Sequence, residues 1–141
     1  MEDGKAVNKL RVLYEDNHVI VVVKEKNVLS QADNTHDIDM LTIIKKYLKE
    51  KYNKPGNVYL GLIHRLDRPT GGIMVFAKTS KAASRLSEQI RLNLFTKKYL
   101  AIVNGYFDEK AGVFEDYILK KEDNSSVISN LGKYAKLEYE V

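Results

Sequence analysis

The residues best suited to chemistry stand together from His64 to Gly72, in the order His-Arg-Leu-Asp-Arg-Pro-Thr-Gly-Gly. One carboxylate, that of Asp67, lies between the cations Arg65 and Arg68. Charged side chains held together in this way are common at functional sites. The alternative is a surface group of ion pairs, each worth about 0–1 kcal/mol. The residue types alone leave both interpretations open.

Two apolar runs must position this stretch. Residues 58–63 and 73–77 each have the composition of a strand, and the second reads as buried. Between them, Pro69 interrupts regular structure, and two glycines allow positive φ or a close approach of backbone. If the first strand stays extended past its end, Arg65 and Asp67 point to the same face. The sequence therefore predicts a loop held by two strands, the usual location of functional residues.

Positive charge is concentrated around this loop. Residues 64–98 contain eight basic and two acidic side chains, a net charge of +6, whereas the whole chain carries +4. The remainder of the chain is therefore slightly acidic. Such an asymmetry is typical of a surface that binds nucleic acid, and a solvated basic face is the alternative.

Composition excludes several kinds of chemistry. The chain has no cysteine, which rules out disulfides and thiolates, and its three histidines lack the spacing of metal ligands. No glycine-rich phosphate loop is present, and a glycosidase ordinarily needs two carboxylates where the motif offers one. No apolar run approaches the length of about 20 residues that crosses a membrane. The amino terminus has no signal-peptide core, so we expect a cytoplasmic protein.

At 141 residues we expect a single domain without internal repeats. Polar residues 1–9 are expected to fray, and residues 120–130 form a polar stretch expected to be mobile. The predicted order ββ-α-ββ-α-βββ indicates an α+β fold with a mixed, mainly antiparallel sheet and two helices. The predicted helices cover residues 37–51 and 79–93, and the predicted strands cover residues 10–14, 19–24, 58–63, 73–77, 95–103, 113–119 and 134–141.

The motif from His64 to Gly72, the strand ending Phe-Ala-Lys-Thr, and the later run Lys-Lys-Tyr-Leu-Ala-Ile-Val-Asn-Gly at 97–105 closely resemble the RluA-type pseudouridine synthases. The opening strands at 12–24 belong to the same likeness, which therefore spans most of the chain. The resemblance implies an enzyme that isomerises uridine to pseudouridine in ribosomal or transfer RNA. It also implies that no metal or organic cofactor takes part.

By this resemblance Asp67 acts at the ribose of a flipped-out uridine, as nucleophile or as proton acceptor. Arg65 helps to flip the nucleotide or fills the vacated stack, and Tyr99 lies against the target base, where it can assist removal of the C5 proton. Without the resemblance, Arg65 is an ordinary ion-pair partner of Asp67, and Tyr99 is a core residue. We expect further contacts to RNA, mainly to its phosphates, from His64, Arg68, Lys78, Lys81, Arg85 and Lys98. For His64 a packed or hydrogen-bonded role is the alternative.

The chain departs from the family at three positions. Glu25 follows Lys24 where many relatives have proline, Pro69 replaces a commonly acidic residue, and Gly71 replaces a serine. RluA-type enzymes also continue beyond the point matched by Val141, with an arginine that pairs with the catalytic aspartate, and many carry an N-terminal S4 domain for which residues 1–9 leave no room. We therefore expect the N-terminal part of a catalytic domain, with a non-catalytic RNA-binding module as the alternative. An exposed strand edge near residues 135–141 predicts self-association.

Overall fold

The computed structural model describes residues 10–141. Residues 1–9, expected to fray, lie outside the described residues. The chain forms two compact units, which divide between Lys97 and Lys98. That these two units make up one catalytic domain stays a prediction.

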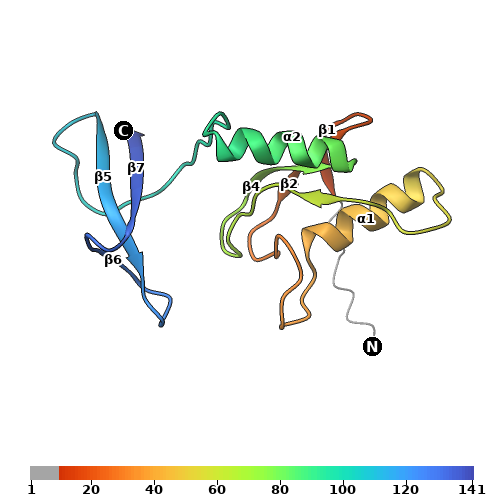
Figure 1. Ribbon diagram of the computed structural model, residues 1–141, viewed down its shortest axis with the longest axis horizontal. Helices are drawn as coiled ribbons and strands as arrows, with labels where there is room; N and C mark the ends of the chain where they lie inside the picture. The colour runs from red at the N-terminus through yellow and green to blue at the C-terminus, as the bar shows by residue number, and fades with distance from the viewer. Residues whose placement is uncertain (1–9) are drawn as a thin grey trace. The chain divides into compact units, whose positions relative to one another are not determined.

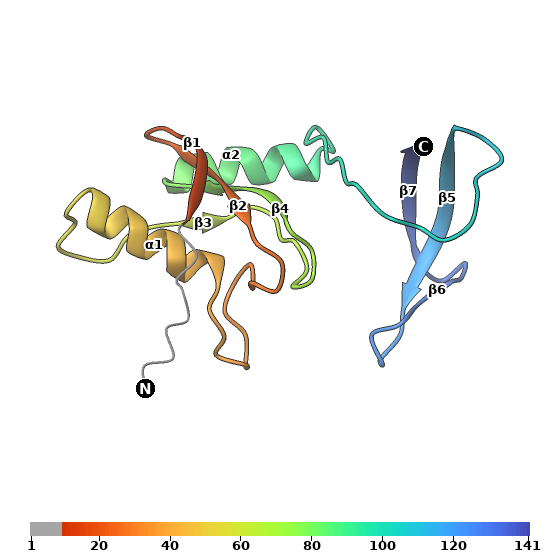
Figure 2. The ribbon, with the colours of Figure 1, turned by 180° about the vertical axis from the view of Figure 1, so that it is seen from behind.

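The first unit contains a four-stranded sheet and two helices (Figure 1). The strands are β1 (Arg11–Glu15), β2 (Val19–Lys24), β3 (Gly61–Leu62) and β4 (Gly72–Ala77). Their order in the sheet is β1-β2-β4-β3, and each neighbouring pair is antiparallel. The helices are α1 (Met40–Lys51) and α2 (Ser80–Arg91). They cover opposite faces of the sheet, as both ribbon views show (Figures 1 and 2).

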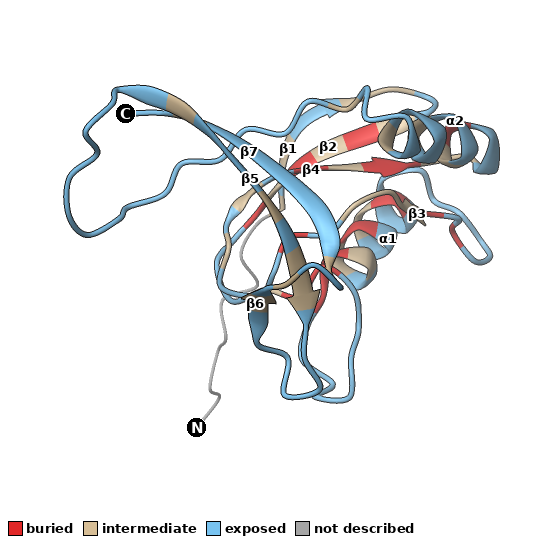
Figure 3. Cartoon of the chain, turned by 60° about the vertical axis from the view of Figure 1, so that its left-hand side comes forward, coloured by how far each residue is buried: buried red, intermediate tan, exposed pale blue. Residues whose placement is uncertain are grey.

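The core of the first unit lies between α1 and one face of the sheet. Both strands are nearly continuous apolar runs, and every second residue of each points to this face and forms one buried layer. Figure 3 shows these buried positions on β2, β4 and α1. Each such side chain contributes about 1.5–3 kcal/mol when it is fully buried. Among the described residues, the apolar side chains with no exposed surface are those of Ile20, Val22, Ile44, Met74, Phe76 and Ala77.

Both helices begin at a side-chain cap. Thr79 accepts a hydrogen bond from the backbone N–H of Ala82 at 3.2 Å, so the predicted start of α2 is confirmed. Asp39 caps α1 by accepting from the N–H of Thr42 at 3.1 Å. The prediction that this helix opens at Asp37 was therefore wrong by one turn, because Asp39 rather than Asp37 supplies the capping carboxylate.

The second unit is a three-stranded antiparallel sheet of order β6-β5-β7. Its strands are β5 (Ala111–Lys120), β6 (Ser126–Ile128) and β7 (Lys133–Glu140). The rings of Phe107 and Phe114 lie 4.7 and 5.0 Å from that of Tyr139, but no residue of 98–141 is buried. Strand β7 is an edge of this sheet. The association expected at that edge stays a prediction.

Three predicted elements differ from the structure. The strand expected at 58–63 forms ladder pairs only at Gly61 and Leu62. Residues 95–103, also expected to be a strand, have no strand partner, and the side chains of Leu100 and Ile102 are fully exposed. A strand needs a neighbouring ladder, whatever its propensity. Conversely, β6 lies in the polar stretch 120–130, where the Asp123 carboxylate accepts from the N–H of Ser125 at 2.9 Å and turns the chain back.

Candidate active site

The motif forms a bend between β3 and β4. The N–H of Thr70 donates to the carbonyl of Asp67 at 3.0 Å, which closes a turn around Arg68 and Pro69. Leu66 is buried in the core, whereas its neighbours Arg65 and Asp67 are exposed. This alternation is the one expected of an extended chain, and it leaves the Asp67 carboxylate accessible from solvent.

A buried serine fixes the residue before the carboxylate. The hydroxyl of Ser30 donates to the carbonyl of Leu66 at 2.6 Å and accepts from the N–H of the same residue at 3.1 Å. Both backbone groups of Leu66 are thereby satisfied by one side chain. Ser30 lies in the loop after β2 and had no sequence signal, because a serine in a loop ordinarily faces water.

A buried lysine fixes the residue after the carboxylate. Lys24, fully buried at the end of β2, donates its ammonium to the carbonyls of Val28 at 2.7 Å and of Glu25 and Arg68 at 3.2 Å. The carbonyl of Arg68 also accepts from the N–H of Asn27 at 2.8 Å. Burial lowers the pKa of Lys24, and the negative charge of Asp67 opposes that shift. Sequence reasoning missed this residue, although it continues the alternation of Ile20 and Val22.

The arginines of the motif differ in their partners. Arg68 forms an ion pair with Asp37 at 2.6 Å, and the hydrogen bond from Arg68 lowers the pKa of that carboxyl. Both side chains are nearly half exposed, so the pair is worth about 0–1 kcal/mol. Within residues 10–141, no ion pair joins Arg65 to Asp67. The simple surface pair considered from the sequence is therefore absent from the described part of the chain.

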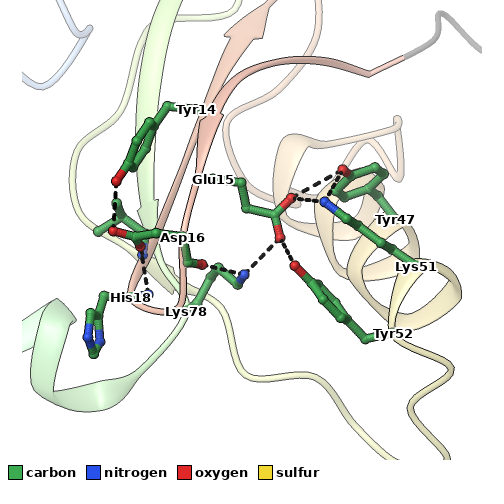
Figure 4. A network of polar contacts seen from close by, with 9 residues as sticks. Tyr14, Glu15, Asp16, His18, Tyr47, Lys51, Tyr52 and Lys78 are labelled. Carbon is green, nitrogen blue, oxygen red and sulfur yellow. Dashed lines mark hydrogen bonds and ion pairs between the residues drawn. The ribbon is translucent and has the colours of Figure 1, made fainter.

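Lys78, one of the expected RNA contacts, is engaged elsewhere. Its ammonium lies 2.8 Å from Glu15 and 2.6 Å from the carbonyl of Asp16, and its side chain is only 11% exposed. Glu15 also accepts from Lys51 at 2.7 Å and from the hydroxyl of Tyr52 at 2.6 Å (Figure 4). This network joins the end of β1 to the end of α1. Its geometry argues against a phosphate contact by Lys78.

The family of the chain can now be stated. A family model described as RNA pseudouridylate synthase matches residues 18–140. The chain belongs to this family. The likeness to its RluA type and the predicted α+β class are both confirmed.

Relatives in this pseudouridine synthase family are longer than the chain. It is 32% identical over 137 residues to ribosomal large subunit pseudouridine synthase D of Borreliella burgdorferi, a match that covers 92% of the chain and 42% of the relative. It is 36% identical over 112 residues to tRNA pseudouridine synthase C of Haemophilus ducreyi, covering 79% of the chain and 43% of the relative. The chain thus spans less than half the length of these relatives.

A solved structure shares the pseudouridine synthase fold. Human RNA Pseudouridylate Synthase Domain Containing 4 superposes with a TM-score of 0.76 at 24% identity, covering 93% of the chain and 53% of that structure. This likeness bears on the fold alone.

Of the remaining predicted residues, His64 is half-buried and the other four are exposed. Lys81 and Arg85 lie on α2 in the first unit, whereas Lys98 and Tyr99 belong to the second unit. The pairing of Asp67 with Tyr99 in one pseudouridine synthase site stays a prediction. In residues 10–141, no three metal-ligating side chains gather at one place, and this part of the chain has no helix that could cross a bilayer.

Proposed function

We propose that this chain supplies the catalytic carboxylate for the isomerisation of uridine to pseudouridine in ribosomal or transfer RNA. The observation that carries the proposal is the exposed carboxylate of Asp67, on a bend whose neighbouring residues are fixed from within by Ser30 and Lys24. A carboxylate held by a rigid scaffold can meet a substrate atom without a further ordering cost.

The reaction breaks the bond between ribose C1′ and uracil N1 and forms one between C1′ and C5. The base must rotate between these steps, the C5 proton is lost, and N1 gains a proton. Asp67 acts beside the sugar, either by attacking it or by taking a proton from it, and both routes are compatible with an exposed carboxylate. A uridine inside folded RNA must first be flipped out to reach this group.

Two further residues complete the proposed site. Arg65, exposed beside Asp67 and without an ion pair to it in the described residues, assists the flip or occupies the vacated stack. Tyr99 lies against the base, where a phenol can assist removal of the C5 proton. Both assignments are supported by the likeness of the motifs at 64–72 and 97–105, in which these residues stand, to those of RluA-type enzymes.

A displaced hydrogen tests the proposal directly. The chain is incubated with ribosomal and transfer RNA carrying tritium at C5 of uridine, and release of tritium into water is measured beside retention of RNA on a filter. Isomerisation releases tritium, whereas a non-catalytic RNA-binding module retains RNA and releases none. Retention of RNA without release of tritium from either RNA would refute the proposed enzyme activity and favour the non-catalytic RNA-binding module.

The basic side chains of α2 provide a prediction about RNA affinity. The two units differ in charge. The first has 17 basic and 11 acidic residues and is net positive, whereas the second has 6 basic and 8 acidic residues and is net negative. We propose that Lys81 and Arg85, one helical turn apart and exposed, contact phosphates. The double variant Lys81→Gln/Arg85→Gln is expected to bind RNA more weakly, with a slope of log K against log salt smaller by about 1.5, because two counterion-releasing contacts are lost.

A matched control has the same change of charge in the second unit. The double variant Lys110→Gln/Lys121→Gln removes two exposed lysines from the acidic unit. Its salt slope is expected to equal that of the unaltered chain. If the Lys81→Gln/Arg85→Gln variant also keeps the salt slope of the unaltered chain, the phosphate contacts lie away from α2.

A further inference from the structure

The ladder between β3 and β4 stops early, at the point where the chain turns toward the bend. Only Gly61 with Ala77 and Leu62 with Phe76 are paired. The next donor along β4 on this side is the N–H of Val75, which a longer β3 would meet with a backbone carbonyl. Instead, it donates to the Nε2 atom of His64 at 3.1 Å.

This side chain therefore replaces a ladder hydrogen bond. A partly buried N–H without a partner costs free energy, so a strand that leaves its sheet early needs another acceptor for the group it abandons. The imidazole of His64 supplies that acceptor from the residue just before Arg65. The backbone can then leave the sheet at Ile63 while the side chain that follows remains bonded to β4.

The surroundings of the ring favour its neutral form. Nε2 can accept only if the ring proton is on Nδ1. The ring is half-buried, and its centroid lies 5.6 Å from that of Phe95. Burial, together with the positive charge of Lys97, lowers the pKa of His64. The acceptor is thus available at neutral pH.

We propose that His64 is a positioning residue, which holds the segment Arg65–Asp67 against β4 through its bond to the Val75 N–H. This role corresponds to the hydrogen-bonded alternative that the sequence left open for His64 beside an RNA contact. The inference rests on the proposed function only for its effect on turnover. The hold on the bend itself is a property of the folded chain.

Two substitutions separate the hydrogen bond from side-chain size. In His64→Gln the side-chain amide oxygen can take the place of Nε2, whereas His64→Leu fills the space without an acceptor. In the leucine variant, amide hydrogen exchange at Val75 is expected to be about tenfold faster, and exchange at Thr70, which closes the bend, is expected to rise with it. The glutamine variant should restore most of the protection. The control is His18→Leu, at an exposed position in the β1–β2 turn. It should leave the exchange rates of the Val75 and Thr70 amides unchanged.

Turnover adds a second readout. The leucine variant is expected to lose about 10²-fold in kcat with little change in KM, as a misplaced catalytic group would. The glutamine variant should recover most of kcat. The inference would be overturned by equal amide exchange at Val75 in the unaltered chain, His64→Leu and His64→Gln. It would also be overturned if kcat fell as far in His64→Gln as in His64→Leu. If the unaltered chain releases no tritium, the proposed function fails, and exchange at Val75 and Thr70 alone decides the role of His64.

Discussion

Replacing Asp67 by asparagine is expected to lower the release of C5 tritium from uridine-labelled RNA by at least about 10²–10⁴-fold, with RNA binding nearly unchanged. The amide has the size of the carboxylate but can neither attack the sugar nor take up a proton at neutral pH. Binding persists because the anchors of the bend lie on backbone groups that the substitution leaves in place, the carbonyls of Leu66 and Arg68. Release of tritium and retention of RNA are measured on the same samples.

The matched control is Asp108→Asn, a change of the same type at an exposed position in the second unit. It is expected to release tritium at the rate of the unaltered chain. An Asp67→Asn protein with full activity would refute the assigned chemistry. Loss of activity together with loss of RNA retention would instead assign Asp67 to substrate binding.

Replacing Glu15 by glutamine is expected to lower the free energy of unfolding of the first unit by about 3 kcal/mol at pH 7. The Glu15 side chain is only 6% exposed and lies between the ammonium groups of Lys51 and Lys78. Burial alone would raise its pKa, but hydrogen bonds from Lys51, Lys78 and Tyr52 outweigh burial and lower the pKa to about 2. A neutral glutamine removes the carboxylate with which Lys78, itself 11% exposed, forms its ion pair.

The same network sets a dependence on pH. Because the folded-state pKa of Glu15 is below its ordinary value of 4.5, its contribution is complete above about pH 4.5 and is lost as the pH falls toward about 2. Urea unfolding should therefore show that the free energy of unfolding of the unaltered chain decreases as the pH falls from about 4.5 to about 2. In Glu15→Gln this decrease should be smaller. The control Glu50→Gln breaks an exposed pair with Lys46 at 4.0 Å and should cost at most about 1 kcal/mol. Parallel pH curves for the unaltered chain and Glu15→Gln would contradict this account.

Several features of the fold could be read from local sequence. The apolar runs of β2 and β4 and the threonine cap of α2 predicted these elements closely, because an apolar run and a capping side chain can both be recognised from residues adjacent in the sequence. Strand β6 and the unpaired stretch 95–103 could not be predicted, because a strand depends on whether a distant segment lies beside it. For 95–103, apolar composition indicated a strand that the described residues do not provide with a partner.

The candidate site divides in the same way. The sequence by itself identified the family and predicted roles for Asp67 and Arg65, because an ordered motif of unusual residue types is readable without coordinates. Only the tertiary structure placed Lys24 and Ser30 under the bend, directed Lys78 to Glu15, and turned His64 toward Val75. The physical reason is that a polar side chain far along the sequence acquires its role from the buried group that it must satisfy, and that group becomes its neighbour only when the chain folds.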